Sequence, residues 1–277
     1  MHIGFAHSAR VRRLVAVGAL AAALLAFLVV ASTASAARAP WTERGVWMWY
    51  LAHPNVADSN ALAKRLRKYH FSWVAVWAHD GSIPRNEDFF AAGWLKPLRK
   101  AGIDICAWGG LNDDPEGNAA VAAQVVTRWK FDCYIANAEA AYKSDSGGDP
   151  GRSARFVSAL HLDVPLALST YGAACKPWNL AAVFDYVPWR NAGYHLLPEA
   201  YWNMTDCYEP LWVVQHSLEA GWPIDRVHPT IGIFAAEHQL TGADYAPLLA
   251  RDGATGFSSY LAEGMTDADY AALSNVR

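Results

Sequence analysis

Two glutamates stand in or directly after apolar segments of this chain. Glu139 follows the apolar segment 131–138, and Asn137 lies two residues before it, so both side chains would share one face of an extended strand. Glu199 lies inside the apolar segment 196–202, where an acid is costly unless it has a partner or a task. Two carboxyl groups held at one site can act as a general acid and as a base or nucleophile. The cleavage of a glycosidic bond requires such a pair.

Aromatic and polar side chains follow other apolar segments and could hold a substrate beside these glutamates. The chain has 13 Trp, 12 Tyr and 10 Phe, and sugar rings stack on such side chains while carboxylates and amides bind the sugar hydroxyls. The candidates for substrate binding are Asn137, Tyr201, Trp202, Asp80, Asp113, Trp49, Tyr171 and Tyr260.

The elements that must position these residues alternate regularly. Apolar segments predict eight strands, and most are followed by a segment with helical periodicity. The predicted strands are 45–50, 71–78, 103–109, 131–138, 164–170, 195–202, 227–234 and 254–261. This pattern over roughly 240 residues predicts a single (β/α)8 TIM barrel of the α/β class, whose active site lies where the strands end. A doubly wound sheet is disfavoured because residues 50–54 supply no glycine-rich turn for a nucleotide.

The first 36 residues have the features of a signal peptide. Three arginines precede an apolar stretch at 14–31, and an Ala-x-Ala site ends at Ala36. The stretch is also long enough to span a bilayer, so an uncleaved anchor is the alternative. Either way, we expect the barrel, residues 41–277, to be secreted or associated with the cell envelope, with no membrane contact of its own.

Charge and cysteine content narrow the function further. Removing the signal takes away three of 23 basic residues and none of 26 acidic ones, so the net charge changes from −3 to −6 and disfavours nucleic-acid binding. Cys175 and Cys207 lie in polar stretches and are the predicted disulfide of this exported protein. Cys106 and Cys133 lie in apolar strand segments and are expected to be buried thiols. No spacing indicates a metal site, and no cofactor is predicted.

The layout resembles the glycoside-hydrolase-like TIM barrels that bacteria export. The resemblance covers residues 41–277 and rests on segments 45–50, 107–119, 131–142 and 196–202. Family 18 chitinases end their fourth strand in Asp-x-x-Asp-x-Asp-x-Glu. The matching positions here are Asp132, Ile135, Asn137 and Glu139. The resemblance implies that Glu139 is the proton donor, with Asn137 where the family has an acid.

Three functions remain open at this stage. The first is an exported glycoside hydrolase that acts on a polysaccharide or cell-wall glycan, with Glu139 as general acid and Glu199 as the second carboxylate. The second is a non-catalytic carbohydrate- or cell-wall-binding barrel with a degenerate active site. The third is an envelope-anchored structural protein whose cleft is vestigial. The sequence chooses neither the sugar nor retaining or inverting chemistry, and the first two functions imply a carbohydrate partner.

Overall fold

The computed structural model describes residues 39–171, 183–234 and 239–276. Eight parallel strands close into a barrel, because β1 pairs with both β2 and β9. The barrel strands, in the order in which they pair, are β1 (Arg44–Met48), β2 (Trp73–Asp80), β4 (Asp104–Leu111), β5 (Cys133–Ala138), β6 (Leu166–Tyr171), β7 (His195–Ala200), β8 (Thr230–Gly232) and β9 (Phe257–Tyr260). The predicted (β/α)8 barrel is therefore confirmed. The predicted signal segment lies outside the described residues.

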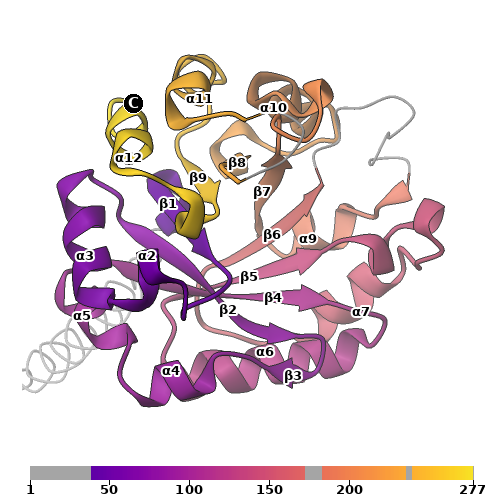
Figure 1. Ribbon diagram of the computed structural model, residues 1–277. Coiled ribbons are helices and arrows are strands. Elements are labelled where there is room, and N and C mark those ends of the chain that lie inside the picture. The colour runs from indigo at the N-terminus through magenta and orange to yellow at the C-terminus, as the bar shows by residue number, and fades with distance from the viewer. Residues whose placement is uncertain (1–38, 172–182, 235–238, 277) are drawn as a thin grey trace, which may run out of the picture. The chain divides into compact units, whose positions relative to one another are not determined.

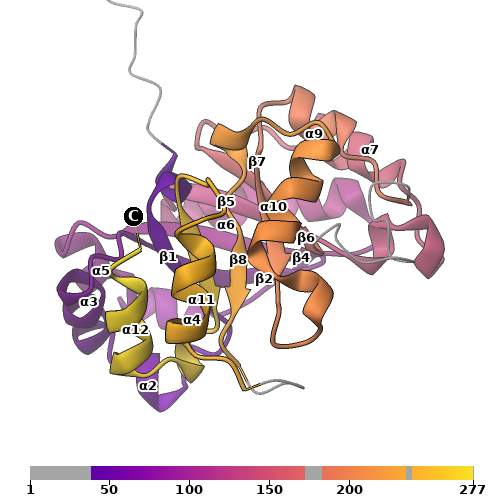
Figure 2. The same cartoon turned by 90° about the horizontal axis from the view of Figure 1, so that it is seen from above.

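Helices lie around the outside of these strands (Figures 1 and 2). They are α2 (Pro54–Ala57), α3 (Ser59–Lys68), α4 (Glu87–Ala91), α5 (Leu95–Lys100), α6 (Pro115–Trp129), α7 (Arg152–Ala159), α9 (Val187–Asn191), α10 (Pro210–Glu219), α11 (Gly242–Leu249) and α12 (Asp267–Leu273). No helix in the described ranges is long and apolar enough to cross a membrane.

Short polar side chains set where several helices begin. The Asp58 carboxylate accepts hydrogen bonds from the backbone N–H groups of Asn60 and Ala61 and so caps α3. Asp114 accepts from the Gly117 N–H at the start of α6, with Pro115 in the first helical position. The turn after β4 is therefore fixed by helix capping.

The structure adds one short strand to the predicted pattern. β3 (Ile83–Pro84) pairs antiparallel with the end of β2. His79 holds this hairpin, since its Nδ1 lies 2.8 Å from the Gly81 carbonyl and its Nε2 lies 2.8 Å from the Tyr134 hydroxyl. Burial lowers the pKa of His79 to about 4, so the imidazole is neutral near pH 7.

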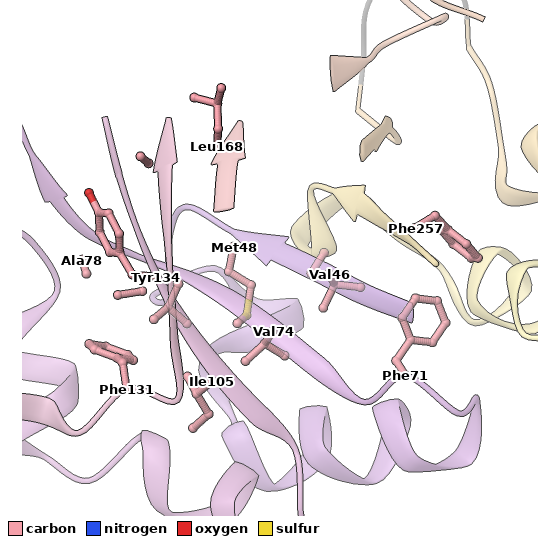
Figure 3. Close-up of a cluster of buried hydrophobic side chains, with 14 of the residues drawn as sticks. Val46, Met48, Phe71, Val74, Ala78, Ile105, Phe131, Tyr134, Leu168 and Phe257 are labelled. Carbon is pink, nitrogen blue, oxygen red and sulfur yellow. The ribbon is translucent and has the colours of Figure 1, made fainter. Parts of the chain in front are cut away.

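Strand residues alternate between two separate apolar layers. The outward-facing residues, such as Val46, Val74 and Ile105, pack with helix residues in one large core (Figure 3). The inward-facing residues form a second cluster inside the barrel. Tryptophan dominates this inner cluster, where Trp41 and Trp73 meet edge to face at 5.9 Å between ring centroids. Gly45 leaves room for Trp73, because a Cβ there would overlap its indole.

Cys106 and Cys133 form a disulfide inside the barrel, so the expectation of two buried thiols was wrong. β4 and β5 are parallel neighbours, and their register places the two Cα atoms opposite each other, 4.4 Å apart. Two inward-facing cysteines on adjacent strands at the same level are within bonding reach. Cys175 and the side chain of Cys207 lie outside the described residues, so that pair stays a prediction.

Candidate active site

Glu139 sits at the end of β5 and accepts two hydrogen bonds through its carboxylate. The Asn137 amide Nδ2 donates to Oε1 at 2.7 Å. The Tyr171 hydroxyl, at the end of the neighbouring strand β6, donates to Oε2 at 2.7 Å. Burial, and then the negative charge of Glu139, raise the pKa of Tyr171, so this hydroxyl stays protonated and serves as a donor.

Glu199 lies at the end of β7, next to Tyr171 in the strand register. Its side chain is buried, with 4% of the residue exposed, and it lines the same cavity as Glu139. Burial raises the pKa of the Glu199 carboxyl well above its usual range, and the charge of Glu139 raises it further. The site therefore holds two carboxyl groups that influence each other but have different surroundings.

The cavity that contains both carboxyl groups opens where the barrel strands end, and its volume is about 960 Å³. Four tryptophans from β1, β2, β4 and the residue after β1 form one wall, with ring centroids 5.4 to 6.2 Å apart. They are Trp47, Trp49, Trp77 and Trp108. Tyr201, Phe234 and Tyr260 form a second wall, with centroids 5.4 to 5.6 Å apart.

Two of these aromatic side chains are held by hydrogen bonds. The Trp47 indole N–H donates to the Ser258 hydroxyl at 2.8 Å, and the Trp108 indole N–H donates to the Met48 carbonyl at 3.1 Å. The segment that carries Trp49 is held differently, since Glu263 Oε1 accepts from the backbone N–H groups of Trp49 and Tyr50, both at 2.7 Å. Glu263 thereby positions the outer end of the aromatic wall.

Charged side chains lie at the edge of the cavity. Lys143 places its ammonium 5.0 Å from the centre of the Tyr171 ring and 3.5 Å from Asp145. Asp80 lines the cavity and pairs with Arg85 at 3.0 Å. Within the described ranges, no group of three or more His, Cys, Asp or Glu side chains is arranged to bind a metal ion.

The structure brings most of the sequence-predicted site residues to this cavity. Those that line it are Trp49, Asp80, Asn137, Glu139, Tyr171, Glu199, Tyr201 and Tyr260. Asp113 does not line it, because it is an exposed residue of the turn that starts α6. Trp202 does not line it either. It lies two residues beyond the end of β7, and its ring centroid is 6.1 Å from that of Tyr245 of α11.

Several cavity residues were missed from the sequence. They include Trp47, Trp77, Trp108, Lys143 and Tyr208. For Trp77 a signal existed: Trp73, Ala75 and Trp77 alternate along β2, and this period places all three on the inner face, with Trp77 nearest the strand end. Lys143 and Tyr208 lie outside the barrel strands, so periodicity could not have placed them.

This arrangement contains the groups that binding and hydrolysis of a neutral polyhydroxylated substrate would require. The aromatic walls offer faces for the C–H surfaces of sugar rings, and the amide and carboxyl groups offer partners for hydroxyls. Of two carboxyl groups in different environments, one can donate a proton to a glycosidic oxygen and the other can stabilise the positive charge that develops on the sugar.

Comparison with known proteins shows the fold. No protein-family model and no curated protein sequence matches the chain. Among solved structures, the spore cortex-lytic enzyme SleL of Bacillus cereus aligns with a TM-score of 0.62 at 9% identity, over 85% of this chain and 74% of SleL. A chitinase from Chromobacterium violaceum aligns with a TM-score of 0.59 at 14% identity, over 82% and 97% of the two chains. The family GH18 chitinase of Cycas revoluta aligns with a TM-score of 0.60 at 10% identity, over 84% and 98%. The chain therefore has the fold of the glycoside-hydrolase TIM barrels.

Proposed function

We propose that this protein is an exported glycoside hydrolase that acts on a polysaccharide or a cell-wall glycan. One observation carries the proposal: Glu139 and Glu199 line a single aromatic-walled cavity where the strands of the barrel end. Active sites of TIM barrels occupy this face, and glycosidases use two carboxyl groups there. Export rests on the signal-like segment 1–36 of the sequence.

Both carboxyl groups are required in such a reaction. One must protonate the leaving oxygen, and the other must stabilise or attack the anomeric carbon. The sequence pattern assigns the general acid to Glu139. Asn137 and Tyr171 orient Glu139, while Tyr201, Tyr260 and Trp49 offer stacking faces to the sugar.

The names of the solved neighbours suggest which substrates to test first. These neighbours are described as chitinases and as spore cortex-lytic enzymes. Chitin and bacterial peptidoglycan therefore head the panel, followed by plant and fungal polysaccharides.

The test measures binding and released reducing ends for the wild-type protein and two variants, Glu139→Gln and Glu199→Gln. We expect the wild type to cleave one substrate class and each variant to bind it with turnover reduced by about 10²-fold or more. The matched control is Glu219→Gln, an exposed glutamate near the end of α10, which should leave turnover unchanged.

Two outcomes would contradict the hydrolase. Binding without cleavage by the wild type would favour the non-catalytic carbohydrate-binding barrel, the alternative that Asn137 in place of an acid would explain. Undiminished cleavage by both variants would remove the two glutamates from the mechanism.

A further inference from the structure

Glu139 has the surroundings of an ionised carboxylate. Both its oxygens accept short hydrogen bonds, one from an amide N–H of Asn137 and one from the hydroxyl of Tyr171. Hydrogen bonds donated to a carboxylate favour its charged form. The Tyr171 hydroxyl remains a donor because burial and the Glu139 charge oppose its own ionisation.

Glu199 has the opposite surroundings. It is buried against the cavity wall, and among the described residues it has no hydrogen bond or ion pair. The titratable groups that interact with it come from β5, β6, β9 and the segments after β7, and none is cationic. They are Glu139, Tyr171, Tyr260, Tyr201 and Tyr208. A carboxyl group in such a place is retained as the neutral acid.

We propose that Glu199, and not Glu139, gives the proton to the leaving oxygen, while Glu139 acts as the carboxylate. This inference rests on the proposed function and reverses the roles that the sequence pattern assigns. It follows from the effect of environment on paired carboxyl groups, in which a carboxyl in apolar surroundings keeps its proton and can act as the acid, while one in polar, hydrogen-bonded surroundings stays ionised.

The proposed step balances as follows. The bond between the anomeric carbon and the leaving oxygen breaks, its electron pair goes to that oxygen, and the oxygen takes the Glu199 proton. The Glu139 carboxylate stabilises the positive charge that develops on the sugar ring. A water oxygen then bonds to the anomeric carbon, and its proton returns to Glu199. One water is consumed, and both carboxyl groups end as they began.

Asn137 fits this assignment better than an acid would. An aspartate at this position would stand 2.7 Å from Glu139 Oε1, and two carboxyl groups at that distance share one proton. In the arrangement seen here the Asn137 amide donates its N–H to Glu139, and a donated hydrogen bond favours the ionised carboxylate. The residue that departs from the family 18 pattern thus agrees with the reversed roles.

The first experiment locates the proton without using turnover. Infrared spectra of the wild-type protein at pH 7 are compared with those of Glu139→Gln and Glu199→Gln, and the carbonyl band of a protonated carboxylic acid is followed. We expect Glu199→Gln to lose this band and Glu139→Gln to keep it. Subtracting each variant from the wild type cancels other buried acids, such as Asp252, whose pKa burial raises to about 6. Circular dichroism of each variant checks that it is folded.

The second experiment measures which carboxyl group protonates the leaving oxygen. A phenyl and a dinitrophenyl glycoside of chitobiose are used as probes, because the dinitrophenolate leaves without a proton. Glu199→Gln should lose about 10²–10⁴-fold in kcat/KM on the phenyl glycoside and much less on the dinitrophenyl one. Glu139→Gln should lose comparably on both.

The outcomes separate the inference from the proposed function. A band lost in Glu139→Gln overturns the role assignment, even if the protein is a hydrolase. A band lost in Glu199→Gln with no cleavage of any polysaccharide by the wild type overturns the hydrolase, and with it the catalytic role of the Glu199 proton.

Discussion

The Tyr171 hydroxyl donates a 2.7 Å hydrogen bond to Glu139 Oε2. Tyr171 ends β6 and Glu139 follows β5, so the pairing of these two strands brings the residues together. Tyr171 also lies opposite Glu199 in the register of β6 and β7. One tyrosine thus stands between the two carboxyl groups and bonds only to the one that we propose to be ionised.

Removing the Tyr171 hydroxyl should impair the proposed reaction. We expect Tyr171→Phe to lower kcat/KM by about 10- to 100-fold, because a hydrogen bond to a charged group contributes about 1.5–3 kcal/mol. Tyr194→Phe is the control, since the buried Tyr194 hydroxyl has no hydrogen-bond partner among the described residues. An unchanged kcat/KM in Tyr171→Phe would mean that this hydrogen bond does not support the reaction.

Replacing Asn137 by aspartate distinguishes the two role assignments. If Glu139 must be ionised, Asn137→Asp should lower the rate of release of reducing ends at pH 7 by about tenfold or more, because the new acid and Glu139 would share one proton. If Glu139 were instead the proton donor, restoring the acid of the family 18 pattern should raise this rate. Asn60→Asp, on the exposed face of α3, is the control and should have no effect.

Two tryptophans that the sequence grouped together should behave differently. Trp49 lines the cavity, whereas Trp202 faces Tyr245 of α11. We expect Trp49→Ala to weaken oligosaccharide binding by about tenfold or more, since stacking on an aromatic face contributes of the order of 1 kcal/mol beyond the area buried. Trp202→Phe should leave binding unchanged and lower only the melting temperature. Calorimetric titration with chitin oligosaccharides and thermal unfolding measure the two effects, and weaker binding by Trp202→Phe would contradict this placement.

Local patterns predicted the barrel and several of the residues that line its cavity. The alternation of β5 and β7, continued one residue past the end of each strand, was sufficient to place Asn137, Glu139 and Tyr201 at the cavity. Trp202 lies two residues past the end of β7, where alternation no longer applies, so grouping it with Tyr201 failed. The Cys106–Cys133 disulfide could not be predicted from either strand segment alone, because it depends on the register in which β4 and β5 pair.

The sequence could not predict which of the two carboxyl groups is protonated. Whether Glu199 or Glu139 holds the proton depends on burial and on donors from other strands, above all Tyr171, which is 32 residues from Glu139 in the chain. A family pattern supplied a role for Glu139, but the donors around it determine its charge. Lys143 and Tyr208 were missed because they lie in connections between strands, where no period constrains the side chain.

The free energy of unfolding should depend on pH through the buried Glu199 carboxyl, and this can be measured without any substrate. The pKa of this carboxyl in the folded protein is raised above its ordinary value of 4.5, so the folded state favours its protonated form. Below that value both states hold the proton. Above it the unfolded chain releases the proton, and the folded state loses about 1.4 kcal/mol per pH unit until the folded-state pKa is passed. Glu199→Gln carries no such penalty, because it stays neutral at every pH.

We therefore expect wild type and Glu199→Gln to unfold at similar denaturant concentrations at pH 4, and the variant to be increasingly more stable as the pH rises above 5. Asp252→Asn should show a difference of the same sign that grows up to about pH 6, since burial raises the pKa of Asp252 from 3.8 to about 6. Asp163→Asn, at an exposed position in the segment before β6, should show no growing difference. A stability difference between the wild type and Glu199→Gln that does not change from pH 4 to pH 7 would mean that the Glu199 carboxyl ionises as readily in the folded protein as in the unfolded chain, which would contradict its role as the proton donor.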